Sequence, residues 1–306
     1  MPAACAIRST PICGDSSMSS HLRGKTLFIS GASRGIGLAI ALRAARDGAN
    51  VAIAAKTDQP HPRLPGTIQS AAAQVEAAGG RALALVCDIR DEQQVEAAVA
   101  ASVAKFGGID VCVNNASAIS LTPLLDTPIR RFDLMHGVNA RGSFLVTQQC
   151  MPHLLKSANP HVLTISPPLA MQERWFAPHV AYSMAKFGMS MVVLGVAGEY
   201  RGRVGVNALW PRTAIDTAAM AVLASHMPIG ALRSARIMAD AAHLILSSDA
   251  RQNTGNFYID DELLAAHGIT DLSGYGPPGV RDIDITPDIF VPSLRELRGA
   301  GGAATP

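Results

Sequence analysis

The chain has 306 residues, of which 48% are hydrophobic, and its formal net charge is +2 at pH 7. This composition supports a large buried core, while the absence of a dense run of lysines and arginines argues against a nucleic-acid surface. The sequence holds no apolar run of transmembrane length, and its five cysteines form no C-x-x-C pair, so neither a zinc site nor a disulfide framework is indicated.

Both ends of the chain read as flexible. Residues 1–23 are small and polar and lack the apolar core of a secretory signal, so we expect a flexible N-terminal extension and a cytoplasmic protein. The alternative is a transit peptide, because the stretch is rich in serine and nearly free of acidic residues. A single domain is expected over 24–293, followed by a flexible tail over 294–306.

Seven short apolar runs alternate with segments of helical period from residue 25 onward. Helical patterns such as "GIGLAIALRAARDG" and "DEQQVEAAVAASVAKFG" lie between the runs, and Gly48 and Gly107 follow these two where helix caps belong. Strands that are apolar almost throughout are buried on both faces. The pattern therefore predicts an α/β fold, a single doubly wound parallel sheet of the Rossmann type with helices on both faces. The expected strands are 25–30, 50–55, 82–87, 110–115, 161–166, 204–210 and 256–260.

A glycine-rich turn, "SGASRGIG" (30–37), follows the first strand and opens a helix. Glycines there permit a tight turn and close approach of the backbone to a pyrophosphate, and the helix N-terminus offers free N–H groups to phosphates. This context favours a nucleotide site over a turn without a ligand. The turn residues that we expect at the cofactor are Gly31, Ser33, Arg34, Gly35, Ile36 and Gly37.

Further motifs follow in a fixed order: "NNAS" (114–117), "VNARG" (138–142) and a Tyr182-x-x-x-Lys186 pair. With the glycine turn, they resemble the short-chain dehydrogenase/reductase family. The segments "KTDQPHPRLPGTI", "NNASAISL", "TISPPL" and "NALWPRTAI" more closely resemble its hydroxysteroid dehydrogenase-like protein 2 subfamily. Members of that subfamily often carry a C-terminal sterol-carrier domain, which we do not expect in this chain.

The resemblance implies a nicotinamide cofactor, and the second strand bears on its type. An acidic residue at the end of that strand usually binds the ribose hydroxyls of NAD, whereas this strand ends in Ala55 and Lys56. With Arg34 in the glycine turn, the lysine suits the 2′-phosphate of NADP(H); the alternative is that both are solvated surface charges. By resemblance, Asp88 contacts the adenine and Asn114 supports the cofactor cavity.

Tyr182 and Lys186 lie four residues apart, so a helix places them on one face. A carbonyl that accepts a hydride needs a proton, and a nearby cation lowers the pKa of a tyrosine toward the useful range, whereas burial opposes this. We expect Tyr182 to be the acid–base group and Lys186 to tune it. In the family the lysine also binds the nicotinamide ribose.

Two further residues complete the expected catalytic set. Asn139 in "VNARG" matches the family asparagine that holds a water next to the lysine, and the alternative is a structural asparagine that bends a helix. The family serine position is taken here by Pro167, which has no donor. Either the neighbouring Ser166 supplies the hydroxyl, or the site works without one.

We therefore expect an NADP(H)-dependent oxidoreductase that interconverts an alcohol and a ketone. Apolar residues such as Trp210, Ile215 and Met220 on the substrate side suggest a hydrophobic or lipid-like substrate. The alternative is a catalytically impaired nucleotide-binding protein of the same fold. The histidines show no metal-ligand spacing, so we expect no metal. By resemblance, the apolar helix face in "SMSMVVLGVAG" implies a homodimer or homotetramer.

Overall fold

The computed structural model describes residues 22–60, 65–224 and 229–301. Seven parallel strands form one sheet in the order β3-β2-β1-β4-β5-β6-β7, which confirms the predicted doubly wound fold. Each predicted strand is present within one or two residues of its expected limits. The strands are β1 Thr26–Ser30, β2 Asn50–Ala55, β3 Arg81–Val86, β4 Val111–Asn114, β5 His161–Ile165, β6 Gly205–Trp210 and β7 Phe257–Ile259.

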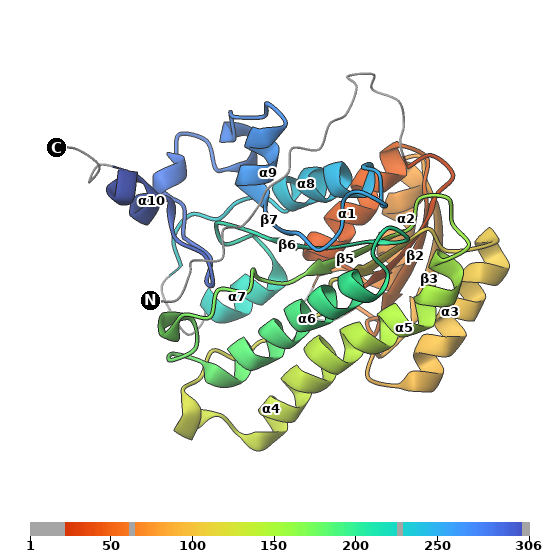
Figure 1. Cartoon of the computed structure of the whole chain (residues 1–306), viewed down its shortest axis with the longest axis horizontal. Helices are drawn as coiled ribbons and strands as arrows, with labels where there is room; N and C mark the ends of the chain where they lie inside the picture. The colour runs from red at the N-terminus through yellow and green to blue at the C-terminus, as the bar shows by residue number, and fades with distance from the viewer. Residues whose placement is uncertain (1–21, 61–64, 225–228, 302–306) are drawn as a thin grey trace.

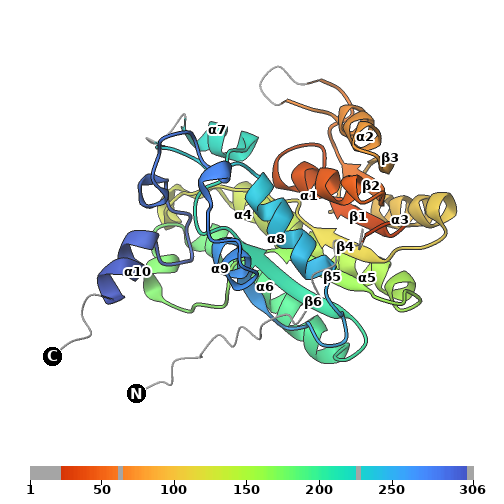
Figure 2. The same ribbon diagram turned by 90° about the horizontal axis from the view of Figure 1, so that it is seen from above.

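Helices cover both faces of the sheet (Figure 1, Figure 2). Helices α1 and α8 pack side by side with α2 on one face, and α3, α5 and α6 cover the other, with α4 packed against α6. The α-helices are α1 Gly35–Arg46, α2 Ile68–Ala77, α3 Glu92–Phe106, α4 Ile129–His136, α5 Gly142–Leu154, α6 Val180–Glu199, α7 Ala218–Ala224, α8 Arg236–Leu246, α9 Asp260–Ala266 and α10 Leu294–Gly301.

Side chains of one strand divide between the two layers because successive residues point to opposite faces. In β1, Leu27 and Ile29 join the core under α1 and α8, whereas Phe28 joins the core under α3 and α5. All five residues of β1 are buried. Burial on both faces explains why the strand sequences are apolar without alternation.

Helix α6 forms the centre of one helical layer. By length and composition alone it could cross a membrane, but 56% of its most apolar 18-residue stretch is buried inside the fold. It runs beside α5 (Figure 1) and presents Tyr182 and Lys186 from its first two turns. The apolar character of α6 is that of a core helix.

The described residues include only part of each segment that was predicted to be flexible. Of the predicted extension, only Leu22 and Arg23 fall within the described residues, and Leu22 is buried. The predicted tail begins with α10. Ser293 and Glu296 form reciprocal side-chain to backbone hydrogen bonds of 2.7 and 3.2 Å at its start, a capping box that stabilises the first turn.

Candidate active site

A cavity of about 640 Å³ opens at the carboxyl edge of the sheet. Its wall includes residues at or just after the ends of β1 to β6, because parallel strands end at one edge. The strand order reverses between β1 and β4, and ligands of doubly wound sheets bind in the crevice at such a switch point. Nine predicted site residues line this cavity: Gly31, Ser33, Arg34, Gly35, Ile36, Lys56, Asp88, Tyr182 and Lys186.

The glycine turn leaves no room for side chains at two positions. Gly31 has φ +68°, and a Cβ there would lie 2.8 Å from the Ala116 Cα. A Cβ on Gly37 would collide with the Asn115 amide. Gly37 thus lies behind the cavity wall and allows α1 to pack tightly on the sheet. This is the close approach that a phosphate-binding turn requires.

The N-terminus of α1 opens toward the cavity. No side chain caps it, and its first turn holds no acidic residue. Ser33, Arg34, Gly35 and Ile36 line the cavity at this point, so backbone N–H groups of the first turn are available to an anion. The turn and the uncapped helix fit the pyrophosphate of a dinucleotide.

Charged side chains pair at the end of the cavity next to β2 and β3. The Lys56 ammonium lies 3.8 Å from the Asp88 carboxylate, which also pairs with Arg90 at 2.6 Å. The hydrogen bond from Arg90 is the main cause that lowers the pKa of Asp88 to about 2. Arg34 donates a hydrogen bond of 2.9 Å to the Gly66 carbonyl, which ties the glycine turn to the segment before α2.

Tyr182 and Lys186 lie at the other end of the same cavity, and both side chains are almost fully buried in the protein. The Lys186 ammonium donates to the Ile165 carbonyl at 2.7 Å and lies 4.8 Å from the centre of the Trp210 ring. These contacts from β5 and β6 fix the lysine near the phenol. The predicted placement of the pair on one helix face is therefore present in the structure.

Burial dominates the electrostatics of this pair. It raises the pKa of Tyr182, an effect to which the charge of Asp288 adds and which the hydroxyl of Ser117 opposes. Burial also lowers the pKa of Lys186 to about 7, against the opposing effect of Asp288. The expected downward tuning of the tyrosine therefore does not prevail here. Burial thus keeps Tyr182 in its protonated form, which is the form that can donate a proton, and favours the neutral form of Lys186.

The two predicted asparagines lie behind the cavity wall. Asn139, fully buried in a π-helical turn over 137–141, accepts a hydrogen bond of 2.7 Å from the Ala118 N–H and donates one of 3.0 Å to its carbonyl. Asn114 donates to the Thr147 hydroxyl at 2.7 Å. Both side chains thus hold the wall of the cavity in place through their neighbours.

Ser166 is not brought to the cavity. It is 1% exposed, and its hydroxyl is buried without a hydrogen-bond partner. The adjacent Pro167 carbonyl accepts a hydrogen bond of 2.6 Å from the Ser190 hydroxyl, which fixes the backbone at this point. Ser166 therefore does not line the cavity, whereas the preceding residue Ile165 does, as do Tyr182 and Lys186.

Two polar residues that the motifs did not single out line the cavity near Tyr182, namely Ser117 and Asp288. Ser117 follows β4 directly and belongs to the "NNAS" segment, so its position next to a recognised motif was a usable signal. Asp288 comes from an irregular segment far beyond β7. No spacing rule relates it to Tyr182, and only the folded chain reveals their proximity.

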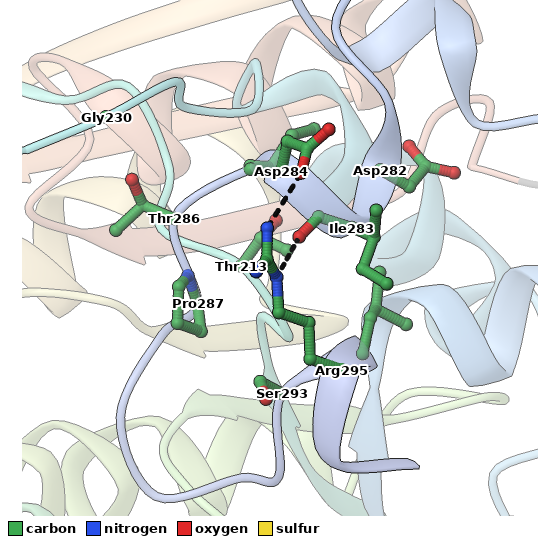
Figure 3. A pocket seen from close by; sticks show the side chains of 11 residues that line it. Thr213, Gly230, Asp282, Ile283, Asp284, Thr286, Pro287, Ser293 and Arg295 are labelled. Atoms are coloured by element: carbon green, nitrogen blue, oxygen red, sulfur yellow. Dashed lines mark hydrogen bonds and ion pairs between the residues drawn. The ribbon is translucent and has the colours of Figure 1, made fainter. Parts of the chain in front are cut away.

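A second cavity, of about 310 Å³, lies between Thr213 and the segment that precedes α10. Figure 3 shows Arg295 extending from α10 to the Asp284 carboxylate at 2.8 Å and the Ile283 carbonyl at 3.2 Å. These contacts attach α10 to the segment that carries Asp288.

Comparison with known proteins agrees with this geometry. The family model described as short chain dehydrogenase matches residues 25–227. Hydroxysteroid dehydrogenase-like protein 2 from Danio rerio is 55% identical over 271 residues, which are 88% of this chain and 64% of that protein, so the chain spans less than two thirds of its length.

Solved structures give the same result. A dehydrogenase from Xanthomonas campestris has 59% identity and a TM-score of 0.85, covering 89% of this chain and 99% of that one. A metagenomic short-chain oxidoreductase in complex with NADP has 25% identity and a TM-score of 0.64, covering 78% and 97%. Because the family model matches most of the chain and the glycine turn and Tyr-Lys pair share one cavity, this chain belongs to the short-chain dehydrogenase/reductase family, whose members are oxidoreductases that bind a nicotinamide cofactor.

Proposed function

We propose that this protein is an NADP(H)-dependent oxidoreductase that interconverts an alcohol and a ketone on a hydrophobic substrate. The observation that carries the proposal is one cavity with a dinucleotide cradle at one end and the Tyr182–Lys186 pair at the other. A catalytically impaired nucleotide-binding protein is the less favoured alternative, because both members of the pair reach the cavity.

The chain's own residues account for the proton and its control. A bound nicotinamide exchanges a hydride with the substrate carbon. In the reductive direction Tyr182 donates its phenol proton to the carbonyl oxygen, and in the oxidative direction the phenolate accepts it. Lys186 provides positive charge next to this exchange, and the Ile165 carbonyl holds its ammonium in place. General acid–base help of this kind contributes about 10²–10⁴ in rate.

The preference for NADP(H) is supported by the residues at the end of β2. Ala54, Ala55 and Lys56 line the cavity there, with no carboxylate from this strand to repel a 2′-phosphate. Lys56 is the more available cation, because its side chain is 59% exposed and its contact with Asp88 is long. The Arg34 guanidinium donates a hydrogen bond to the Gly66 carbonyl, and this bond would have to break before Arg34 could reach a phosphate.

A hydrophobic substrate is supported by the composition of the cavity wall on the nicotinamide side. This part of the wall is formed mainly by aliphatic and aromatic side chains from the loop after β4, from β6, from α7 and from the C-terminal segment. Such a surface favours lipid-like molecules with few polar groups. The side chains are Ile119, Leu121, Trp210, Ile215, Met220 and Ile289.

A homodimer or homotetramer is supported by apolar side chains that α5 and α6 leave exposed. Phe144, Met184, Met191 and Leu194 are 46–56% exposed. Large apolar side chains exposed on two neighbouring helices are typical of a protein–protein interface.

The proposal is tested by the purified protein with a panel of long-chain ketones and ketosteroids, each with NADPH and with NADH. We expect reduction of at least one ketone, faster at limiting NADPH than at equal NADH, and a lower dissociation constant for NADPH. Equal dissociation constants would overturn the cofactor assignment, and cofactor binding without turnover across the panel would favour the impaired alternative.

A further inference from the structure

Phe290 has a backbone conformation that bulky side chains rarely adopt. Its φ angle is +73°, and it is the only residue other than glycine with a positive φ among the residues that the structure describes. Its side chain is nonetheless fully buried. Conformations of this kind persist only where the surrounding contacts determine them, and they gather at functional sites. The contacts of this ring therefore bear on function.

The Phe290 ring packs on the ring of Tyr182. The two centroids lie 6.0 Å apart with an interplanar angle of 25°, a stacked arrangement within the range of favourable aromatic pairs. The His179 ring meets both rings edge-on, at 6.1 Å from Tyr182 and 5.8 Å from Phe290. Tyr182 lines the cavity and Phe290 does not, so Phe290 supports the phenol ring from outside the cavity.

Phe290 also contacts residues next to Lys186. Its ring lies 5.4 Å from that of Phe187, which follows the lysine in α6, and 5.7 Å from that of Trp210. The Trp210 ring in turn lies 4.8 Å from the Lys186 ammonium. A single side chain thus packs against the tyrosine of the pair and against two residues that adjoin the lysine.

The backbone on both sides of Phe290 is fixed to the end of β6. The Trp210 Nε1 donates to the Ile289 carbonyl at 2.8 Å, and the Arg212 Nη1 donates to the Pro292 carbonyl at 3.0 Å. Because both flanks are held, the Phe290 ring has little freedom to move away from the phenol. Side chains that are themselves locked by packing keep catalytic groups in their productive geometry.

We propose that Phe290 is a positioning residue that fixes the orientation of the Tyr182 phenol, so that the C-terminal segment completes the active site. This inference rests on the proposed function. Phe290 exchanges no proton and lies outside the cavity wall, so it acts through the tyrosine. Its replacement should therefore slow proton transfer without weakening the binding of cofactor or ketone.

The test compares Phe290→Leu with Phe28→Leu, using NADPH and the ketone that the unmodified protein reduces fastest. Both phenylalanines are fully buried, but Phe28 lies in β1, in a core separate from that of Tyr182 and Phe290. Because a misplacement of about 1 Å can cost about 10² in rate, we expect kcat to fall by about ten- to hundredfold in Phe290→Leu. The KM for the ketone and the NADPH dissociation constant should stay the same, and Phe28→Leu should change none of the three.

Phe290→Met, whose flexible side chain adapts to irregular gaps, replaces the leucine variant if that variant does not bind NADPH. A kcat within twofold of the unmodified protein would overturn the inference. So would an equal fall in Phe28→Leu, or a loss that appears in KM alone.

A measurement without turnover separates this inference from the proposed function. The chain has four tyrosines, so labelling with 3-fluorotyrosine gives few fluorine resonances, and Tyr182→Phe identifies the one from Tyr182. Loss of the stacked ring should shift this resonance in Phe290→Leu but not in Phe28→Leu. An unchanged Tyr182 resonance would overturn the inference whatever the activity. A shifted resonance in a protein that turns over no ketone or alcohol would refute the proposed function and, with it, the positioning role, while the contact itself stands.

Discussion

At the scale of single residues, Lys56 determines the charge at the end of β2. Its ammonium is largely exposed and only loosely paired with Asp88, so it can reorient toward a 2′-phosphate. A hydrogen bond to a charged group contributes about 1.5–3 kcal/mol. We expect Lys56→Ala to weaken NADPH binding about tenfold or more and to leave NADH binding unchanged, as measured by fluorescence titration at low salt.

The matched control for Lys56 is Lys105, an exposed lysine in the last turn of α3. The chain runs back along α3 from the carboxyl edge of the sheet, so Lys105 lies far from the cavity. Lys105→Ala should change neither dissociation constant. Equal weakening of NADPH and NADH in Lys56→Ala would contradict a specific phosphate contact.

Asp288 places a carboxyl group in an apolar cavity. Its N–H donates to the Arg212 carbonyl at 3.0 Å, and one of its own carboxylate oxygens accepts from the Ile289 N–H at 2.7 Å. Burial raises its pKa to about 7. Its charge, present above that pH, raises the pKa values of both Tyr182 and Lys186.

Because the Asp288 charge raises the pKa values of Tyr182 and Lys186, its removal should change the pH dependence of ketone reduction. Ketone reduction needs a protonated Tyr182 and a charged Lys186, so activity falls as pH rises through the lower of their pKa values. Asp288→Asn removes the anion and lowers both pKa values. We expect the alkaline limb of kcat/KM for ketone reduction to move to lower pH by about one pH unit.

Asp284→Asn is the control for this profile, because Asp284 lies on the same segment and pairs with Arg281 and Arg295 instead. In Asp284→Asn the alkaline limb of kcat/KM should lie at the same pH as in the unmodified protein. A profile of Asp288→Asn that also stays in place, or moves to higher pH, would show that Asp288 does not act on the pair.

At the scale of elements, the buried Arg212 joins three parts of the chain. It follows β6, its Nε lies 2.7 Å from the Asp261 carboxylate, and it also pairs with Glu262, both in α9. Its Nη1 donates to the Pro292 carbonyl at 3.0 Å, just before α10. These contacts attach the C-terminal segment to the sheet and so position Asp288 over the cavity.

Removal of the Arg212 guanidinium leaves the Asp261 carboxylate, which is 12% exposed, without its partner, whereas Glu262 is 58% exposed and stays hydrated. Breaking a buried pair in this way costs about 3–5 kcal/mol. We expect Arg212→Met to lower the free energy of unfolding by about that amount, measured by urea denaturation. Arg281→Met, which removes a solvent-exposed pair with Asp284, should lower the free energy of unfolding much less than Arg212→Met does. Equal stability of the two variants would contradict the tethering role.

The elements themselves were largely predictable from the sequence. Apolar runs and helical periods are local signals, so all seven predicted strands are confirmed. Helix α10 was missed, although Ser293 and Glu296 have the spacing of a capping box, because the glycine-rich residues that follow read as a flexible tail.

The site was predictable only where it depends on local spacing. Tyr182 and Lys186 lie one helical turn apart, and the glycine turn adjoins its own strand and helix. Ser166 was considered for the site because it precedes Pro167, but it does not line the cavity and its hydroxyl is buried without a hydrogen-bond partner. Asp288 could not be predicted, since its proximity to Tyr182 arises from the folding of a long irregular segment.

At the scale of the whole molecule, the exposed apolar face of α5 and α6 is the surface where we expect a second copy to bind. Met191 is 56% exposed on this face. Met191→Glu should convert the oligomer into monomers in analytical ultracentrifugation, because a buried unpaired carboxylate opposes association. Met171→Glu, which changes a 66% exposed methionine on the loop before α6, should not. A monomeric unmodified protein at micromolar concentration would refute the assembly.

The proposed reaction depends on one phenol, that of Tyr182, and Tyr182→Phe tests its role most directly. The substitution removes a single oxygen from a buried ring that packs against Phe290 at a centroid distance of 6.0 Å, so the fold should persist. The measurement is steady-state ketone reduction together with the NADPH dissociation constant. We predict loss of turnover by at least about 10²-fold with unchanged NADPH binding. Retained turnover in Tyr182→Phe would contradict the assignment of Tyr182 as the proton donor.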